Sequence, residues 1–224
     1  MKRTPLGERR LPGYTRGEEI FNMVSHIVGG ALGITATTLC VIVAALHHNV
    51  MGVISGAIFG ATMILLYTMS SIYHGLSPRL TAKKVFQIID HCTVYILIAG
   101  SYTPFTLVSL RAQNAALGWT IFALVWGVAI VGIVFTAIDL RTFRIPSIIC
   151  YLAMGWLIVF AIKPVIRAIG TGGTILLVAG GLAYTVGAIL YINGRRRQYT
   201  HSIFHLFVLA GSILHFLCVL FCVM

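Results

Sequence analysis

The sequence predicts an all-α membrane protein, a bundle of seven transmembrane helices, from its composition and from its repeated long apolar stretches. Hydrophobic residues make up 58% of the 224-residue chain and charged residues 9%, and the mean hydropathy is +0.96. These values lie far outside the range of soluble globular proteins. Apolar stretches recur along almost the whole length, and a stretch of about 20 residues can cross ~30 Å of hydrocarbon as a helix. We therefore expect one polytopic domain and no separate soluble domain.

Seven spans are expected, joined by short loops that contain Gly, Pro or Asn. They cover residues 20–46, 50–76, 84–110, 115–138, 145–162, 171–192 and 199–224. The seven-helix domain is thus 20–224, and residues 1–19 form a basic N-terminal arm. This arm is too polar to contain the apolar core of a cleavable signal peptide, so the first span is expected to enter the membrane directly.

The positions of Lys and Arg predict the orientation of the helices. Thirteen of the sixteen cations fall in the N-terminal arm and in the second, fourth and sixth loops, and three fall on the other side. Because cationic loops are retained in the cytoplasm, the N-terminus is expected inside and the C-terminus outside. The net charge of +11 is then explained by an inner cationic rim that meets anionic lipid headgroups, and not by nucleic-acid binding.

Three histidines and one aspartate are predicted to lie together at the cytoplasmic ends of their helices. His201 and His205 are four residues apart, on one face of the last span, and His74 ends the second span. Two imidazoles on one helix face provide half of a tetrahedral metal site. Asp90 is a carboxylate inside an apolar span, a costly position that usually has a function. Alternatives remain: Asp90 could reach the interface or pair with a nearby Lys84 or Arg, and water or headgroups could satisfy the histidines.

Five motifs in order resemble the haemolysin III branch of the progestin and adipoQ receptor family, and the likeness covers essentially the whole chain. The motifs are Glu19-x-x-Asn22-x-x-x-His26, Ser70-x-x-x-His74, Asp90, Gly100-Ser101-Tyr102-Thr103-Pro104 and His201-x-x-x-His205. The resemblance implies a Zn²⁺ cofactor held by His74, His201 and His205, with a water in the remaining position that Asp90 holds. It also implies that Ser70 stands where related lipid-amide hydrolases contact their substrate. Three protein ligands with one open position are typical of catalytic zinc.

The predicted function is hydrolysis of a lipid amide or ester at the cytoplasmic membrane interface, with the zinc-bound water as nucleophile and Asp90 and Ser70 as catalytic residues. Ceramidase-like chemistry is known in the eukaryotic branch that the chain resembles, but for a short bacterial-type member the resemblance does not imply the substrate. The expected location is the plasma membrane of a bacterium. Two alternatives are kept. One is a non-enzymatic lipid sensor or regulator, in which Asp90 completes a structural zinc site. The other is a haemolysin-like cytolytic protein, ranked last because most helices offer no continuous polar stripe.

Three further features bear on packing and on the extent of the site. Gly52, Gly56 and Gly60 form a small-residue stripe that predicts close contact with the first span inside one bundle, although it leaves room for a homodimer. Pro104 predicts a kink in the third span. His215 lies ten residues beyond His205. That separation is about 15 Å along a helix, too far for His215 to join the metal site.

Overall fold

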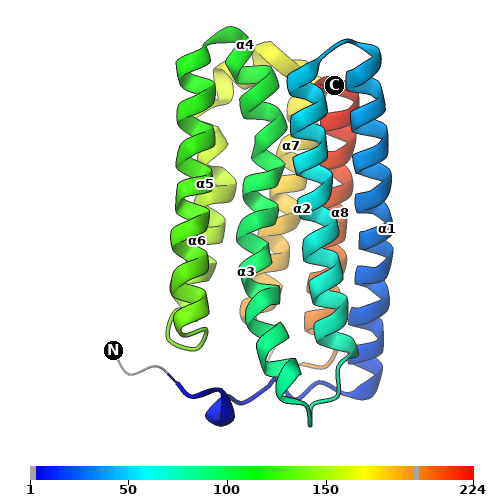
Figure 1. Cartoon of the computed structure of the whole chain (residues 1–224), viewed down its shortest axis with the longest axis vertical. Coiled ribbons are helices and arrows are strands. Elements are labelled where there is room, and N and C mark those ends of the chain that lie inside the picture. The colour runs from blue at the N-terminus through cyan, green and yellow to red at the C-terminus, as the bar shows by residue number, and fades with distance from the viewer. Residues whose placement is uncertain (1–3, 194–196) are drawn as a thin grey trace.

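The computed structural model describes residues 4–193 and 197–224, and these form an elongated bundle of helices with no strand among them (Figure 1). The principal helices are α1 (Arg16–Leu46), α2 (Val50–Gly75), α3 (Thr81–Pro104), α4 (Arg111–Gln113), α5 (Ala115–Ile138), α6 (Arg144–Trp156), α7 (Ile162–Asn193) and α8 (Thr200–Cys222). Short segments η1 (Leu6–Glu8), η2 (Phe105–Leu110) and η3 (Leu157–Ala161) join or precede them. Lys2, Arg3, Arg195 and Arg196 of the expected cationic rim lie outside the described residues.

Six helical segments in the described chain are long and apolar enough to cross a membrane, and the longest joins the fifth and sixth predicted spans. This segment, Arg144–Ile192, has 49 residues, and the loop expected at 163–170 is largely helical. Pro164 does not interrupt it because the first turn of a helix tolerates proline. Gly170, with φ 69° and ψ 177°, is the non-helical residue at which the segment bends. A glycine is suited to that backbone conformation because it has no Cβ.

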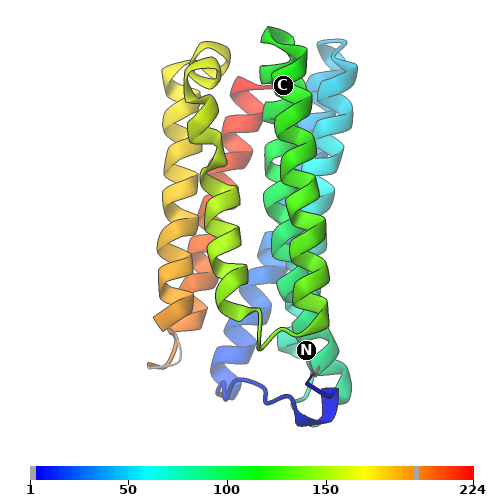
Figure 2. The same ribbon diagram turned by 90° about the vertical axis from the view of Figure 1, so that its left-hand side faces the viewer.

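The two halves of this long segment lie side by side. The chain rises through α6 and descends through α7 (Figure 2). The Trp156 indole Nε1 donates a hydrogen bond of 3.0 Å to Thr185 Oγ1 across the pair. In a straight helix those two residues would be about 44 Å apart. The segment is therefore a helical hairpin.

The glycine stripe of α2 packs against α1, as the sequence predicts. A Cβ built on Gly56 would lie 3.0 Å from the Cys40 Cβ, and one on Gly60 would overlap Thr37. In the same interface a Cβ on Gly29 of α1 would overlap the Tyr67 ring. Hydrocarbon gives little hydrophobic drive for helix association, so such close backbone approach allows the van der Waals contact that holds these helices together.

Pro104 ends the regular part of α3, and the helix continues directly as the π-helical segment η2. Proline lacks an N–H and cannot satisfy the carbonyl one turn earlier, and a π-turn is one way in which a helix absorbs that loss. The hydroxyl of Thr106 donates a 3.0 Å hydrogen bond to the Tyr102 carbonyl next to this turn. The sequence predicts a kink at Pro104, and the structure shows a π-helical segment directly after it.

The N-terminal arm crosses the end of the bundle at which α1 begins, instead of extending freely. The Thr4 amide donates a 2.8 Å hydrogen bond to Asp139 Oδ2, at the end of α5. Arg9 is 8% exposed and donates to the Ile138 carbonyl at 3.4 Å. Burial opposes ionisation of Asp139, but hydrogen bonds from Thr4 and from two nearby backbone amides outweigh it and hold its pKa well below the ordinary value. The arm thus ties α1 to the α5–α6 connection.

Candidate metal centre

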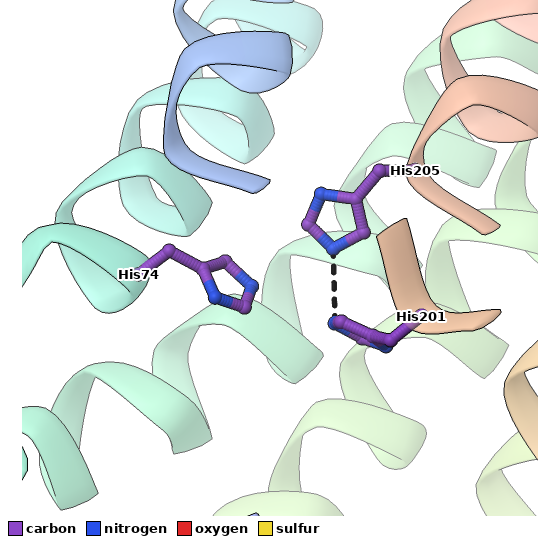
Figure 3. Close-up of side chains that lie close together, drawn as sticks. All are labelled: His74, His201 and His205. Carbon is purple, nitrogen blue, oxygen red and sulfur yellow. Dashed lines mark hydrogen bonds between the residues drawn. The ribbon is translucent and has the colours of Figure 1, made fainter. Parts of the chain in front are cut away.

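His74, His201 and His205 come together between the last turn of α2 and the first two turns of α8 (Figure 3). All three are buried, and one ligand nitrogen from each lies within 4.8 Å of the other two. His201 Nε2 and His205 Nε2 are 3.0 Å apart. His74 Nε2 is buried without a hydrogen-bond partner in the described part of the chain. The structure therefore brings the three predicted ligands into one cluster.

The donor set of this cluster fits a tetrahedral zinc ion. Zn–N bonds are about 2.0–2.1 Å long, so two tetrahedral nitrogen ligands lie roughly 3.3 Å apart. The 3.0 Å pair is already near that separation, and the widest separation of 4.8 Å exceeds it only moderately. Three histidine nitrogens would hold the ion and leave the fourth position open.

Glu19 contacts His74 directly, which the sequence does not reveal. Its Oε2 atom lies 2.6 Å from His74 Nδ1. A carboxylate there accepts a hydrogen bond from Nδ1–H, so that in the neutral ring Nε2 carries the lone pair and could bind a metal; such a partner also raises the basicity of the ligand. The signal that could have found Glu19 is its place in Glu19-x-x-Asn22-x-x-x-His26, because residues at these spacings share one helix face.

Lys83 completes this arrangement from the first turn of α3. Its ammonium lies 2.8 Å from Glu19 Oε1, and it donates to the Leu76 carbonyl at 2.9 Å. The residue is 1% exposed. Its assignment to the lipid-facing cationic rim was therefore wrong, because the charge is buried against Glu19. The two oxygens of the Glu19 carboxylate thus contact the Lys83 ammonium on one side and the His74 imidazole on the other.

The N-terminal arm covers the histidines from the end of the bundle. The Tyr14 ring stacks on His201, with centroids 4.8 Å apart and planes 18° from parallel. Thr15 and Glu18 form a capping box that starts α1, and Glu18 Oε1 also accepts a 2.8 Å hydrogen bond from the Tyr199 amide. That second bond fixes the residue preceding α8, which has a left-handed backbone with φ 60°. One carboxylate thus places the start of α1 against the start of α8, within two turns of both histidine ligands of that helix.

His26 packs against the cluster from α1. Its ring stacks on His205 with centroids 3.8 Å apart and meets Tyr67 edge-on at 5.0 Å. Asn22, one turn earlier and fully buried, places its amide nitrogen 3.5 Å from His74 Nδ1. The α1 motif therefore packs against His74 and His205 and restricts the rotation of their rings.

A largely apolar cavity of about 190 Å³ adjoins the cluster, and both predicted catalytic residues lie in its wall. Ser70 is 1% exposed, and Asp90, a residue of α3, has its Oδ2 atom 3.6 Å from Nδ1 of the neighbouring His91. His201 and His205 line the same cavity. Lys84, considered as a partner for Asp90, instead donates a 2.8 Å hydrogen bond to the Gly7 carbonyl of the arm. Asp90 therefore lines the cavity without the contact to Lys84 that was considered.

Comparison with known proteins finds relatives that match most of the chain. The family model described as haemolysin-III related matches residues 14–216, a segment that includes every residue of the cluster. The chain is 43% identical over 208 residues to haemolysin-3 of Bacillus cereus, covering 92% of each protein. It is 41% identical over 208 residues to the haemolysin-3 homolog of Bacillus subtilis (strain 168), covering 93% of this chain and 95% of the relative.

A more distant likeness connects it to an animal protein. The human monocyte to macrophage differentiation factor is 26% identical over 169 residues, which cover 73% of this chain and 68% of that protein. This multi-pass membrane protein therefore belongs to the haemolysin III family, within the wider progestin and adipoQ receptor family.

Proposed function

We propose that this protein is a zinc-dependent membrane hydrolase that cleaves an amide or ester bond of a lipid at the cytoplasmic interface. One observation carries the proposal: three histidine nitrogens converge in a buried position beside an apolar cavity whose wall contains Ser70 and Asp90. A purely structural site would have no need of an adjoining cavity of about 190 Å³. Pockets of this kind, apolar with a few convergent polar groups, are typical of small-molecule sites.

The chemistry divides among the residues according to their type. Zinc, when bound, polarises a carbonyl and lowers the pKa of a coordinated water. Asp90 accepts a proton from the attacking water and returns it to the leaving nitrogen or oxygen as the C–N or C–O bond breaks. The Ser70 hydroxyl donates a hydrogen bond to the carbonyl oxygen, where negative charge develops. Glu19 and Lys83 keep His74 oriented throughout.

The surroundings of the cluster favour a lipid substrate. The cavity walls are mainly aliphatic and aromatic side chains of α3, α6, α7 and α8. Tyr14 and the arm cover the cluster at the end of the bundle. A long acyl chain would bury its methylene groups in the cavity, and each buried group would contribute about 0.8 kcal/mol to binding.

The test is metal analysis of the purified protein together with incubation on a panel of lipid amides and esters. We expect His205→Ala to lose both zinc and turnover. We expect Asp90→Asn and Ser70→Ala to keep zinc and to lose at least about 100-fold in turnover. Ser71→Ala is the matched control, because the Ser71 hydroxyl already donates to the Tyr67 carbonyl at 2.7 Å.

Other outcomes would favour the alternative functions. Bound zinc without turnover on any lipid of the panel would contradict the hydrolase and support a lipid sensor or regulator, with Asp90 as a fourth ligand. Release of dye from liposomes by the wild-type protein, unchanged in the His205→Ala variant, would support the cytolytic function that the names of the Bacillus relatives suggest.

We also infer seven crossings of a bacterial plasma membrane, with the N-terminus inside, the C-terminus outside and the remaining basic rim against anionic headgroups. The helical hairpin of α6 and α7 supports two crossings for Arg144–Ile192, and the distribution of cations supports the orientation. Single cysteines in a cysteine-free background test this topology. An impermeant maleimide added outside should label Gln113→Cys and Arg167→Cys but not Ser77→Cys, and the reverse pattern would overturn the orientation.

A further inference from the structure

His215 is a polar group in the cavity that the proposed hydrolysis does not use. It lies on α8 ten residues beyond His205 and lines the same cavity. Along the helix axis this separation is about 15 Å. His215 therefore stands far from the metal cluster, beside the part of the cavity where an acyl chain would extend.

The hydrogen bonding of His215 determines which of its nitrogens is an acceptor. Its Nε2 atom lies 3.1 Å from the Leu177 carbonyl oxygen of α7. A carbonyl oxygen only accepts, so Nε2 must carry the proton of the neutral ring. Nδ1 is then an acceptor, and it is buried without a hydrogen-bond partner in the described part of the chain. The Nδ1 atom therefore lacks a hydrogen-bond donor.

The ring is held in place by its neighbours. A Cβ on Gly180 of α7 would overlap the imidazole, so the glycine lets α7 approach closely enough for the bond from Nε2. Tyr184 packs on the ring edge-on, with centroids 5.3 Å apart, and its hydroxyl lies 2.8 Å from Ser212 Oγ. The imidazole is therefore held in one orientation by its neighbours, and its Nδ1 atom stays unpaired in that orientation.

Other polar groups in this part of the cavity wall already have partners. The Ser101 hydroxyl donates to the Leu97 carbonyl at 2.8 Å, and the Thr185 hydroxyl donates to the Gly181 carbonyl at 2.8 Å. The Tyr102 hydroxyl donates to the Gly155 carbonyl at 2.9 Å and accepts from the Ile158 amide. Among these groups, the Nδ1 atom of His215 is the one left to accept a hydrogen bond from a ligand in this region.

We propose that His215 accepts a hydrogen bond from a hydroxyl group on the acyl chain of the substrate, so that the cavity selects mid-chain hydroxylated acyl groups. The inference rests on the proposed function for the position of the scissile carbonyl beside the histidine cluster. An extended chain with C–C bonds of about 1.5 Å advances roughly 1.3 Å per bond, so 15 Å corresponds to about twelve bonds. A ketone at the same carbon offers no proton and would not satisfy Nδ1.

The experiment measures binding of three matched fatty acids to the purified protein: octadecanoic, 12-hydroxyoctadecanoic and 12-oxooctadecanoic acid. We expect the hydroxy acid to bind about fivefold more tightly than the other two, the factor expected for one added hydrogen bond. His215→Phe should remove the preference and still bind the plain acid. Ser101→Ala, which removes a cavity hydroxyl that is already paired, should keep the preference.

Two readouts separate this inference from the proposed function. Equal binding of the plain and hydroxylated acids by the wild-type protein would overturn the inference, and it would mean that Nδ1 is satisfied by water only. This comparison uses the unaltered chain, so it stands even if His215→Phe does not fold. Turnover of the matched amides tests the hydrolase separately: a binding preference without turnover would keep the inference about the cavity and reject the reaction.

Discussion

Replacing Glu19 by Gln tests whether a carboxylate holds His74 for the metal. The side chain keeps its shape, but the 2.6 Å contact with His74 Nδ1 loses its charge. Loss of such an outer partner typically lowers metal affinity by about 10- to 100-fold, which corresponds to roughly 1.4–2.8 kcal/mol. We therefore expect the zinc dissociation constant of Glu19→Gln to rise by that factor.

The same substitution leaves Lys83 as a buried cation without its carboxylate. Its side chain is 2% exposed and lies 2.8 Å from Glu19 Oε1 in the native protein. Breaking a buried ion pair from one side costs about 3–5 kcal/mol, and the 15% exposure of the Glu19 side chain places the expected loss at the lower end. We therefore expect lower thermal stability as well, whether or not zinc is bound.

A double variant separates the two effects. Adding Lys83→Met to Glu19→Gln removes the unpaired cation, so stability should recover while zinc affinity stays low. Zinc affinity is measured by competition with a chromophoric chelator, and stability by thermal unfolding in detergent. Glu8→Gln in the arm is the matched control and should change neither. Wild-type zinc affinity in Glu19→Gln would refute the role assigned to this carboxylate.

Three further predictions concern the arm and the helix packing. Tyr14→Ala should speed removal of zinc by a chelator, because the ring that covers His201 at 4.8 Å is lost; an unchanged rate would contradict the covering role. Gly60→Val should lower stability to thermal unfolding by about 1–3 kcal/mol through overpacking, whereas Gly30→Val, where a Cβ meets nothing within 4 Å, should have little effect. The depressed pKa of Asp139 stabilises the attached arm above the ordinary carboxyl pKa of 3.8, and this contribution is lost as the pH falls further. The protection of the Thr4 amide against hydrogen exchange, relative to an unstructured amide at the same pH, should therefore fall below about pH 4, and Asp139→Asn should show low protection already at neutral pH.

The helices and the histidine cluster could be predicted because both follow from local signals. The bounds expected for α5, 115–138, agree with the structure, since a long apolar run begins just after the N-cap residue Asn114. The histidines were expected to meet because each stands at a helix end on the same side of the membrane. Helix periodicity and loop charge carry that information residue by residue.

The rest depends on contacts between distant residues. Glu19 in the first turn of α1 resembles an ordinary acidic residue at a helix start, and only the folded contact across 55 residues identifies its partner. In the sequence Lys83 resembles the other cations of the cytoplasmic loops, because its contact with Glu19 forms only in the folded protein. The sequence predicts a loop at residues 163–170 between two spans, whereas the structure shows a helix that bends at Gly170. Apolar composition does not distinguish a loop from a helix that turns back on itself.

The central claim is that three histidines from two helices hold one divalent ion. An anomalous difference map of the zinc-loaded protein, recorded at the zinc edge, tests it most directly. We predict a single strong peak about 2.0–2.1 Å from one nitrogen each of His74, His201 and His205. A map with no peak between these rings, or with the peak bound by other residues, would contradict it.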